Sequence, residues 1–358
     1  MENKVKLLCI SRRYYPSLGG MSKFCSSVFP RINRDEFDVT LLVLGRGQKH
    51  LIWFLPYTVI YLLKNARKYD AIFVGDLLMC IDGWISGKIS SRTKRIVAVH
   101  GLDITYPNKL YQWYIRKFSK GSFDKYVCNS DATGELLNSI GDYDCVTVPS
   151  GVDKDRYIGI KRTRTEFLQR YGIDTEKAIL LTTGRLIKRK GVNWFLRNVL
   201  SGIRSEIVYF IVGKGPELNE IIHSITELNL GDRVRVITEV SDELMDDIYC
   251  NADLFIMPNI HIENDMEGFG LVAIEASLAG MVVIAADVDG ISTAVQDGRN
   301  GYLIEGGNAQ AFIEKIEEVL DADNYREAGL RFSKFTRENY DWDIVVKRYE
   351  TIIKGLLR

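Results

Sequence analysis

The feature that most constrains the fold is an alternation of short apolar runs with helical stretches, which occurs twice along the chain. The runs of the first half are rich in β-branched residues, and Ile96-Val-Ala-Val99 is continuous in apolar residues. Such strands are covered on both faces, and their alternation with helices is typical of a parallel sheet. The predicted strands of this half are residues 5–11, 37–44, 71–74, 96–100, 125–128 and 146–148.

The same rhythm restarts in the second half, with predicted strands at residues 179–183, 207–212, 233–240, 254–257, 282–286 and 301–304. A chain of 358 residues also exceeds the size at which a single hydrophobic core stops growing. A polar stretch without periodicity, residues 154–164, is the expected linker. The sequence therefore predicts an α/β protein of two doubly wound parallel-sheet domains, residues 1–160 and 161–339. An apolar stripe at helical spacing predicts a final helix within 340–358 that docks on one of them.

Composition excludes several classes of protein. The longest apolar stretch, residues 51–63, contains Pro56 and is shorter than the ~20 residues that a membrane-spanning helix needs. The first residues lack the pattern of a secretory signal peptide. A pI near 6.9 and the lack of a nucleic-acid-binding motif disfavour a nucleic-acid partner. Six scattered cysteines without a C-x-x-C pair favour a reducing, cytoplasmic compartment.

Charge is distributed unevenly between the halves. Residues 1–160 carry 23 Lys and Arg against 15 Asp and Glu, and the remainder carries 24 against 32. This indicates either an anionic partner of the first half, such as a lipid headgroup, or a chance distribution of solvated charge. Two segments could make a peripheral membrane contact through the first domain: the basic and aromatic residues 109–120, and residues 51–55. For both segments, packing in the core is the favoured interpretation.

Glu267 and Glu275 flank a glycine-containing stretch that is expected to open a helix. Backbone N–H groups at a helix start are unpaired and can bind a diphosphate, which glycines allow to approach closely. A helical rise of ~1.5 Å per residue separates the two carboxylates by roughly 10 Å, about the length of a diphosphate between a ribose and a sugar. The alternative, a capping acid and a satisfied buried carboxylate, is equally consistent with these residues alone.

A basic loop follows a predicted strand and precedes a helix at Gly184-Arg185-Leu-Ile-Lys188-Arg189-Lys190-Gly191. Arg185 can chelate phosphate oxygens and Lys190 can add a point charge. A solvated basic loop is the commoner explanation for any one of these cations, particularly Lys188 and Arg189. Gly213-Lys-Gly-Pro216 forms a second glycine turn at a strand end, which is a weak signal alone.

In the first half, Gly19-Gly20 follows the first strand and opens the first helix, where phosphates meet α/β sheets. The spacing is not G-x-G-x-x-G, so a nicotinamide site is not favoured. His100 ends the fourth strand at the same edge, although a histidine there is more often structural. The sequence has no metal-ligand spacing, and Asp287-Val-Asp289 is expected to end a strand.

These motifs, in this order, resemble the retaining glycosyltransferases of family 4, whose fold is called GT-B, over nearly the whole chain. The two glutamates are the hallmark of that family. Supporting matches are Gly19-Gly20, His100-Gly-Leu-Asp103, Asn129-Ser130, Val148-Pro-Ser-Gly-Val-Asp153, Gly184-Arg185, Lys190-Gly191 and Gly213-Lys-Gly-Pro216. The resemblance implies two Rossmann-like domains facing a cleft, a last helix that crosses back to the first domain, and a hinge near residues 154–164 and 335–342.

The resemblance also implies residue roles. Glu275 would bind the donor ribose, Arg185 and Lys190 the diphosphate, and Glu267 the donor sugar. His100 would complete the site from the other domain, so that His100, Glu267, Arg185 and Lys190 are the expected catalytic residues. The remaining expected donor-binding residues are Gly19, Gly20, Gly184, Gly213, Phe269, Gly270, Leu271 and Val272.

The activity implied is transfer of a hexose from a UDP- or GDP-linked sugar, with retention and without a metal or other cofactor. The acceptor would be a hydroxyl of a glycan, lipid-linked or small molecule, in cell-surface polysaccharide or glycolipid biosynthesis. The expected location is cytoplasmic or peripheral at the inner membrane face. The alternatives are a nucleotide-sugar epimerase of the same fold and a non-catalytic scaffold. The intact glutamates and cations argue against the scaffold.

Overall fold

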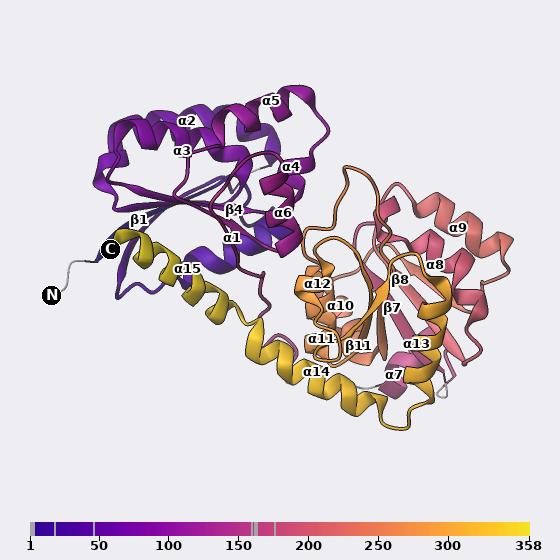
Figure 1. Ribbon diagram of the computed structural model, residues 1–358. Helices are drawn as coiled ribbons and strands as arrows, with labels where there is room; N and C mark the ends of the chain where they lie inside the picture. The colour runs from indigo at the N-terminus through magenta and orange to yellow at the C-terminus, as the bar shows by residue number, and fades with distance from the viewer. Residues whose placement is uncertain (1–3, 18, 46, 159, 161–163, 175–176) are drawn as a thin grey trace. The chain divides into compact units, whose positions relative to one another are not determined.

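The computed structural model describes residues 4–17, 19–45, 47–158, 160, 164–174 and 177–358. The chain forms two compact units, each built on one six-stranded sheet (Figure 1). The first unit comprises Met1–Gly151, Asn264–Phe269 and Trp342–Arg358, and the second comprises Val152–Glu263 and Gly270–Asp341. The prediction of two doubly wound parallel sheets is confirmed.

The sheet of the first unit is parallel throughout, in the order β2-β1-β3-β4-β5-β6. From β1 the chain moves outward to β2 and then returns to the other side with β3, so the switch point lies between β1 and β3. Open α/β sheets bind ligands outside the carboxyl ends of the strands at such a point. The strands are β1 (Val5–Ser11), β2 (Phe37–Val43), β3 (Ala71–Val74), β4 (Lys94–Val99), β5 (Lys125–Cys128) and β6 (Cys145–Thr147).

Helices cover both faces of this sheet (Figure 1). On one face α1 (Gly20–Arg31) and α15 (Trp342–Leu357) enclose a core with the strands. On the other face lie α2 (Leu51–Asn65), α3 (Cys80–Ile89) and α5 (Lys109–Phe118). The short α4 (Leu102–Thr105) and α6 (Asp131–Ser139) complete the unit, together with the 3₁₀ turns η1 (Gln48–His50), η2 (Ala66–Lys68) and η3 (Leu77–Met79).

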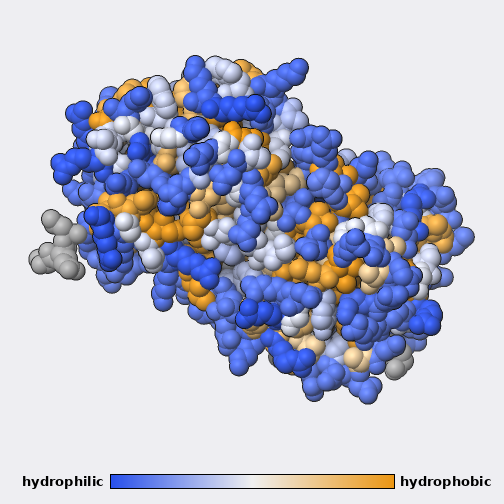
Figure 2. Space-filling model, viewed as in Figure 1, coloured by the Kyte–Doolittle hydropathy of each residue, from blue (hydrophilic) through white to orange (hydrophobic). Residues whose placement is uncertain are grey.

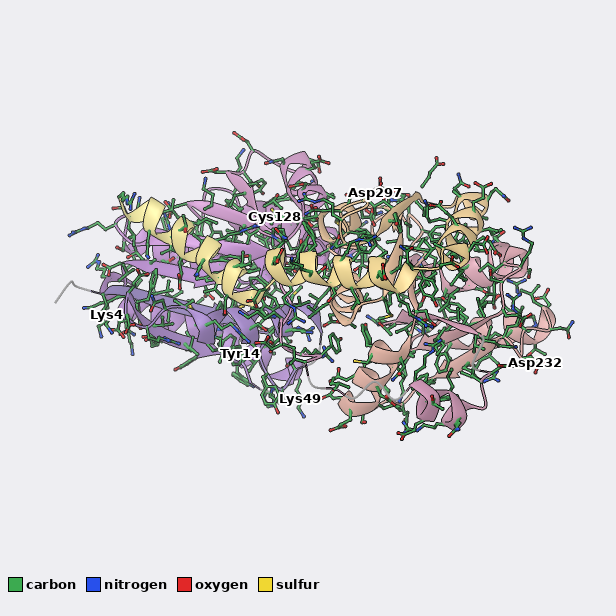
Figure 3. All side chains as sticks on the ribbon, turned by 90° about the horizontal axis from the view of Figure 1, so that it is seen from below. Lys4, Tyr14, Lys49, Cys128, Asp232 and Asp297 are labelled. Carbon is green, nitrogen blue, oxygen red and sulfur yellow. The ribbon has the colours of Figure 1, made fainter. Side chains whose placement is uncertain are left out.

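The last helix, α15, belongs to the first unit although its residues are the last in the chain. Trp342, Val345 and Tyr349 are buried in the core that this helix shares with α1. The carboxylate of Glu350 accepts a hydrogen bond of 2.7 Å from the backbone N–H of Asn33. Figure 3, seen from the side of α15, shows the helix lying across the first unit. The predicted final helix is therefore present and docks on the first unit.

The second unit repeats the architecture, with a parallel sheet in the order β12-β11-β10-β7-β8-β9. Its switch point lies between β7 and β10, because the chain builds β8 and β9 on one side of β7 before crossing to β10. The strands are β7 (Ala178–Thr183), β8 (Ile207–Val212), β9 (Val234–Ile237), β10 (Leu254–Met257), β11 (Val282–Asp287) and β12 (Tyr302–Glu305).

The helices of the second unit enclose a core around Phe195, Tyr209 and Phe312. They are α7 (Arg164–Tyr171), α8 (Val192–Asn198), α9 (Leu218–Glu227), α10 (Asp242–Asn251), α11 (Leu271–Ala279), α12 (Ile291–Ala294), α13 (Ala309–Asp321) and α14 (Tyr325–Asn339), with the 3₁₀ turns η4 (Lys188–Lys190) and η5 (Leu200–Gly202). Within the described part of the chain, no helix combines the length and the apolar character needed to cross a bilayer.

The chain passes between the units at Gly151 and Val152 and again at Asp341 and Trp342, apart from the segment Asn264–Phe269. On the side of the second unit, Val152 forms an isolated parallel bridge with Asp341. The ammonium of Lys154 also donates a hydrogen bond of 2.7 Å to the Asp341 carboxylate. The predicted boundary at residues 160 and 161 falls later in the chain, beside positions 159 and 161–163, which lie outside the described residues. The hinge predicted there stays a prediction.

Candidate functional site

Two glycine loops meet at the carboxyl ends of β7 and β8, beside the switch point of the second unit. Gly213 follows β8, and a Cβ added to it would lie 1.9 Å from the carbonyl oxygen of Gly184, which follows β7. A Cβ on Gly215 would lie 2.1 Å from the carbonyl oxygen of Leu186. The N–H of Leu186 in turn donates to the carbonyl of Lys214 at 2.9 Å. Glycine is therefore required here because the two backbones touch, and the two sequence motifs form one structure.

The basic loop closes through a tight turn that ends at Gly191. Gly191 has φ 66°, and a Cβ there would lie 1.8 Å from the carbonyl oxygen of Pro258, which follows β10. This contact pins the loop against the end of β10. Arg185 is exposed and Lys190 is half-buried. Both lie on the loop that follows the carboxyl end of β7, the edge where α/β sheets bind ligands.

The expectation that Arg189 belongs to a solvated loop is wrong. Arg189 is only 9% exposed. Its carbonyl oxygen accepts a hydrogen bond of 2.9 Å from the N–H of Ile260, so the turn holds this residue against the segment that follows β10. Lys188, in contrast, is exposed as expected.

The helix expected after the glycines is α11, which begins at Leu271 with Gly270 as its N-cap at φ 94°. The helix is buried from Ala273 to Ala279, and Glu275 projects from this buried stretch. Gly270, Leu271 and Val272 therefore lie at its start, as predicted. Glu267 precedes the helix, however, so the helical rise does not set the distance between the two glutamates, and that part of the sequence argument is wrong.

Glu275 has a partner that the sequence analysis missed, Arg156. A guanidinium nitrogen of Arg156 lies 3.4 Å from a carboxylate oxygen of Glu275, and another lies 2.8 Å from Asp246. Burial disfavours the charge on Arg156, but Tyr157, Glu275 and Asp246 outweigh it and raise the pKa of Arg156. Arg156 thus holds the Glu275 carboxylate at one end while remaining charged itself.

Two stacked tyrosines connect this ion pair with the strand ends. The rings of Tyr157 and Tyr249 are parallel within 10°, with centroids 6.0 Å apart. The hydroxyl of Tyr249 lies 2.7 Å from that of Thr183, the last residue of β7. Burial, followed by the nearby Glu275 carboxylate, raises the pKa of Tyr249. Glu275, Arg156 and the Gly184 loop are therefore parts of one arrangement within the second unit.

In the first unit, Gly19 and Gly20 begin α1 beside the switch point. Gly19 is the N-cap with φ 115° and Gly20 is the first helical residue. A Cβ added to either glycine would meet nothing within 4 Å. In contrast with Gly191 and Gly213, these glycines leave open space in front of a helix N-terminus, where an anion is favoured.

His100 follows β4 and is held in place from several sides. Its Nε2 lies 3.1 Å from the carbonyl oxygen of Gly75. Its backbone N–H donates to Asp103 at 3.2 Å, and its ring packs edge-on against Phe24 with centroids 5.0 Å apart. The imidazole is therefore fixed at the edge of the sheet where the prediction located it.

A buried charged cluster accompanies His100 and was not predicted. The guanidinium of Arg12, directly after β1, donates a hydrogen bond of 2.9 Å to Asp76, which follows β3. Asp103 lies beside them and accepts a hydrogen bond from the N–H of Leu77 at 3.3 Å. Burial disfavours the charge on Arg12, but Asp76 and Asp103 outweigh it and raise the pKa of Arg12. The cluster places the buried Arg12–Asp76 ion pair at the switch point of the first unit.

The segment Asn264–Phe269, which carries Glu267 and Phe269, groups with the first unit. A Cβ on Gly268 would lie 2.6 Å from the carbonyl oxygen of His100. A Cβ on Gly101, at φ 80°, would lie 3.2 Å from the Cα of Gly268. Glu267 is buried in this segment. The structure thus brings Glu267 together with His100, and Glu275 together with the Arg185 loop.

Comparisons with known proteins identify the family. A model described as Glycosyltransferase Family 4 matches residues 19–156, and one described as Glycosyl transferases group 1 matches residues 163–338. The two matches together take in most of both units. The chain belongs to these glycosyltransferases.

Individual members of the family are similar over part of their length. The chain is 33% identical over 214 residues to D-inositol 3-phosphate glycosyltransferase 2 of Catenulispora acidiphila, covering 56% of this chain and 48% of that protein. It is 28% identical over 215 residues to the GDP-mannose-dependent alpha-(1-6)-phosphatidylinositol monomannoside mannosyltransferase of Mycolicibacterium smegmatis, covering 58% and 56%. The matched region thus spans about half the length of these two relatives.

A solved structure confirms the GT-B fold. The crystal structure of Anabaena HepE in complex with UDP matches with a TM-score of 0.80 and 19% sequence identity. The match covers 98% of this chain and 100% of that one. At this identity the likeness establishes the architecture of this glycosyltransferase and not its substrates.

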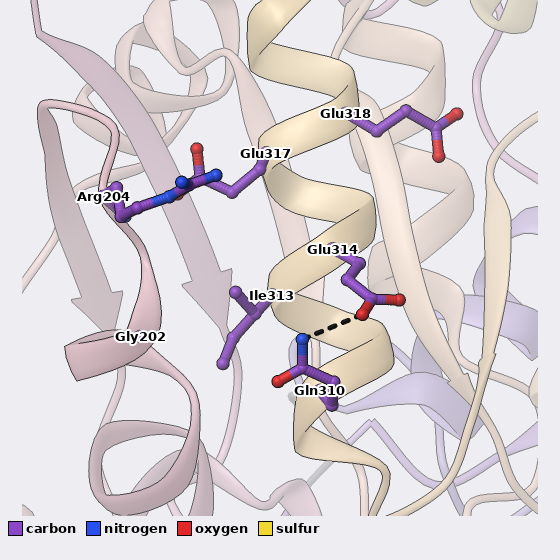
Figure 4. Close-up of a pocket in the computed structure, with 7 residues that line it drawn as sticks. All are labelled: Gly202, Arg204, Gln310, Ile313, Glu314, Glu317 and Glu318. Atoms are coloured by element: carbon purple, nitrogen blue, oxygen red, sulfur yellow. Dashed lines mark hydrogen bonds between the residues drawn. The ribbon is translucent and has the colours of Figure 1, made fainter.

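One hollow of the glycosyltransferase lies away from these strand ends. It is lined by Gly202, Arg204, Gln310, Ile313, Glu314, Glu317 and Glu318, between η5 and α13 (Figure 4). The Glu317 carboxylate accepts hydrogen bonds from the backbone N–H and the hydroxyl of Ser205, at 3.1 and 2.6 Å. Ser205 leads into β8 at its amino end, opposite the edge where α/β sheets bind ligands. Glu317 therefore fixes the backbone that leads into β8.

Among the residues that the structure describes, no three His, Cys, Asp or Glu side chains gather closely enough to hold a metal ion.

Proposed function

We propose that this chain transfers a hexose from a nucleoside diphosphate sugar to an acceptor hydroxyl, with retention of the anomeric configuration. The observation that carries the proposal is the arrangement at the switch point of the second unit. There the exposed Arg185 and half-buried Lys190 lie on a loop fixed by glycine contacts. Glu275, on helix α11, is held by Arg156. Two cations and one oriented carboxylate suit a diphosphate and a ribose.

The roles follow from the chemistry of each group. Arg185 binds phosphate oxygens through its planar fork, and Lys190 adds a compact positive charge. Gly184 and Gly213 allow the backbone to approach the nucleotide. Glu275 accepts hydrogen bonds from the two ribose hydroxyls, with Arg156 keeping the carboxylate oriented. The N-terminus of α11, with Gly270, Leu271 and Val272, directs its positive end toward the diphosphate.

The first unit supplies the remaining groups in this proposal. His100 and Glu267, together with the Phe269 backbone, bind hydroxyls of the donor sugar. Gly19 and Gly20 leave room for the sugar at the start of α1. His100 suits this role because Gly75 and Phe24 fix its ring, and a hydrogen-bonding group that is already fixed loses little entropy on binding.

The reaction in this proposal follows front-face attack. The bond between the anomeric carbon and the diphosphate oxygen breaks while the acceptor oxygen bonds to the same face of that carbon. The departing diphosphate takes the proton of the acceptor hydroxyl. Arg185 and Lys190 stabilise the charge that develops on the leaving group, which is the role that a metal has in other transferases. We propose that no metal or other cofactor takes part.

The donor and acceptor are proposed by class. The solved HepE structure contains UDP, and the mycobacterial relative is named for GDP-mannose, so a UDP- or GDP-linked hexose is the expected donor. One relative is named for an inositol phosphate and the other for a phosphatidylinositol mannoside. We propose a glycan, lipid-linked or small-molecule acceptor, used on the cytoplasmic side in the synthesis of a cell-surface polysaccharide or glycolipid.

Calorimetry with a panel of nucleotide sugars tests this assignment. Glu275→Ala and Arg185→Ala should each weaken donor binding by about tenfold or more, because each removes a charged partner worth ~1.5–3 kcal/mol. Lys214→Ala serves as the matched control, since Lys214 is exposed on the neighbouring loop and pairs with Glu239 at 2.8 Å. Unchanged donor affinity in Glu275→Ala would refute the ribose role.

Turnover assays separate the catalytic proposal from binding. Lys190→Ala should lower kcat more than it weakens donor affinity, because the charge on the leaving group is largest in the transition state. Loss of activity with a chelator and recovery with a divalent metal would overturn the metal-free mechanism. Product formation from donor alone, without an acceptor, would instead indicate the epimerase.

A further inference from the structure

Helix α2 of the first unit exposes an apolar face. No residue from Leu51 to Leu63 is charged, and the helix buries only one side, through Phe54, Thr58 and Leu62. The opposite side presents large side chains to solvent, with Trp53 75% and Ile52 70% exposed. The other exposed apolar residues on it are Tyr57, Ile60 and Leu63. A helix that is apolar all round is normally covered on every side.

The expectation that residues 51–55 pack in the core is therefore only partly right. Phe54 is buried, and Leu51 and Leu55 pack against the core, but Ile52 and Trp53 point away from it. The sequence could not separate these cases because every position of the run is apolar.

The neighbouring α5 and α3 extend the same surface with mixed character. On α5, Leu110 is 73% exposed and Trp113 is also exposed, next to exposed Lys109, Arg116 and Lys117. Core packing, predicted for residues 109–120, holds for Ile115 and not for these residues. The ammonium of Lys117 lies 4.7 Å from the centroid of the Trp113 ring. Aromatic rings and cations thus alternate on this surface.

Basic residues dominate this region of the chain. Residues 45–120 contain 13 Lys and Arg against four Asp and Glu. All four acids lie in the described part of the chain, and Asp76, Asp82 and Asp103 are buried. Asp70, the remaining one, accepts a hydrogen bond of 2.8 Å from the N–H of Lys6. The exposed bases are Lys49, Lys64, Arg67, Lys68, Lys88, Arg92, Lys109, Arg116, Lys117 and Lys120.

We infer that the layer formed by α2, α3 and α5, here called the basic aromatic face, docks on a membrane surface that contains anionic lipids. The exposed side chains of α2 enter the boundary between headgroups and acyl chains, as apolar faces of interfacial helices do. Trp53, Trp113 and the tyrosines suit that boundary, since their rings combine apolar area with a polar edge. The surrounding Lys and Arg are attracted by the negative headgroups. Figure 2 shows apolar side chains reaching the surface between hydrophilic ones along this edge of the first unit.

A second copy of the chain fits this face poorly. A symmetric contact would place the same surface opposite itself and bring the basic residues of both copies together. Only one acid of residues 45–120 is exposed, so such a contact would lack compensating charge. An anionic bilayer supplies both the apolar layer and the negative charge that the face requires.

The face continues along the chain from the candidate site. Leu102 and Tyr106, which follow His100, are exposed, and α5 begins at Lys109. Resting on the proposed function, this continuity favours an acceptor hydroxyl carried by a membrane lipid. Docking itself requires no donor, so it can be tested separately.

Flotation of the full chain with lipid vesicles tests the inference. The protein should float with vesicles of phosphatidylcholine mixed with phosphatidylglycerol, less with phosphatidylcholine alone, and less at high salt. Trp53→Ser should lower the partition coefficient about tenfold, because one large aromatic side chain leaves the interface. Neutralising Lys109, Arg116 and Lys117 to Gln together should lower it roughly a hundredfold.

The matched control is Leu330→Ser with Arg331→Gln, an exposed apolar and basic pair on α14 of the second unit, where Leu330 is 59% exposed. Thermal melting checks that every variant folds. Absence of flotation, salt-insensitive binding, or equal partition of Trp53→Ser and the control would overturn the inference. So would a dimer in light scattering that Trp53→Ser dissociates, because the face would then join two copies. Nucleotide binding by calorimetry distinguishes failure of docking from failure of the proposed function.

Discussion

The two units share one architecture, yet their strand ends are organised differently. In the second unit the loops after β7 and β8 are fixed by backbone contacts, where a Cβ on Gly213 or Gly191 would lie within 2 Å of a carbonyl oxygen. In the first unit Gly19 and Gly20 face open space, and the rigid elements are the buried Arg12 and Asp76. The loops after β7 and β8 of the second unit are thus fixed by backbone shape, whereas the end of β1 in the first unit is held by a buried ion pair.

The two kinds of support allow different sequence changes in the two units. Loops held by backbone contact tolerate no side chain at the glycines, so their geometry is constant. In the proposed function, Arg185 and Lys190 act on the ligand from this fixed position. The open space at Gly19 and Gly20 in the first unit leaves room for side chains to change without a shift of the backbone. Four variants test this contrast, in order of decreasing expected effect.

The largest effect is expected at Gly213. Gly213→Ala places a Cβ 1.9 Å from the carbonyl oxygen of Gly184, so the two loops must separate. We expect a loss of about 4 kcal/mol or more in the free energy of unfolding of the second unit, measured by denaturant titration. If the free energy of unfolding of this variant equalled that of the wild type, the loops would not be held by backbone contact.

The second effect concerns a buried carboxyl group in the first unit. Burial raises the pKa of Asp82 to about 8, from an ordinary value of 3.8. Because the folded state keeps this proton to higher pH, wild-type stability should fall as the pH rises from about 4 to about 8. Asp82→Asn cannot ionise and should match the wild type near the acid end, then exceed it in free energy of unfolding by several kcal/mol above pH 8. Melting curves of both proteins across this pH range measure the difference. If the stabilities of the wild type and Asp82→Asn changed in parallel with pH, the raised pKa of Asp82 would be wrong.

The third effect concerns Arg156, which holds Glu275 and Asp246 in the second unit. Arg156→Gln should weaken nucleotide binding by about tenfold, because the Glu275 carboxylate loses its charged partner. Arg156→Lys keeps the charge without the planar fork, so its nucleotide affinity should lie between those of the wild type and Arg156→Gln. Calorimetry with the nucleotide measures this, and equal affinity of all three proteins would remove Arg156 from the site.

The smallest effect on stability is expected at Gly20. A Cβ there meets nothing within 4 Å, so Gly20→Ala should change the free energy of unfolding by less than about 0.5 kcal/mol. If the open space receives the donor sugar, the Michaelis constant should nevertheless rise. A large loss of stability would show that Gly20, like Gly213, is required by packing.

The fold could be predicted from local pattern, whereas several residues of the site could not. The strand runs and the glycines that start α11 are local signals, so the strands and Gly270 were found. Arg156 lies in a polar stretch and meets Glu275 119 positions later. Arg12 and Asp76 are likewise 64 positions apart, and their pairing depends on the switch point between β1 and β3. Contacts between residues so far apart in the sequence cannot be predicted from the spacing of neighbouring residues.

The docking of α15 has a consequence for biosynthesis. Trp342, Val346 and Tyr349 fill a core whose other walls come from residues 7–148. A ribosome makes chains from the N-terminus at about 5–20 residues per second, so early domains usually fold first. Here the first unit lacks part of its core until residues 342–357 have emerged. The second unit can therefore complete its core before the first unit does, although the first unit is synthesised earlier.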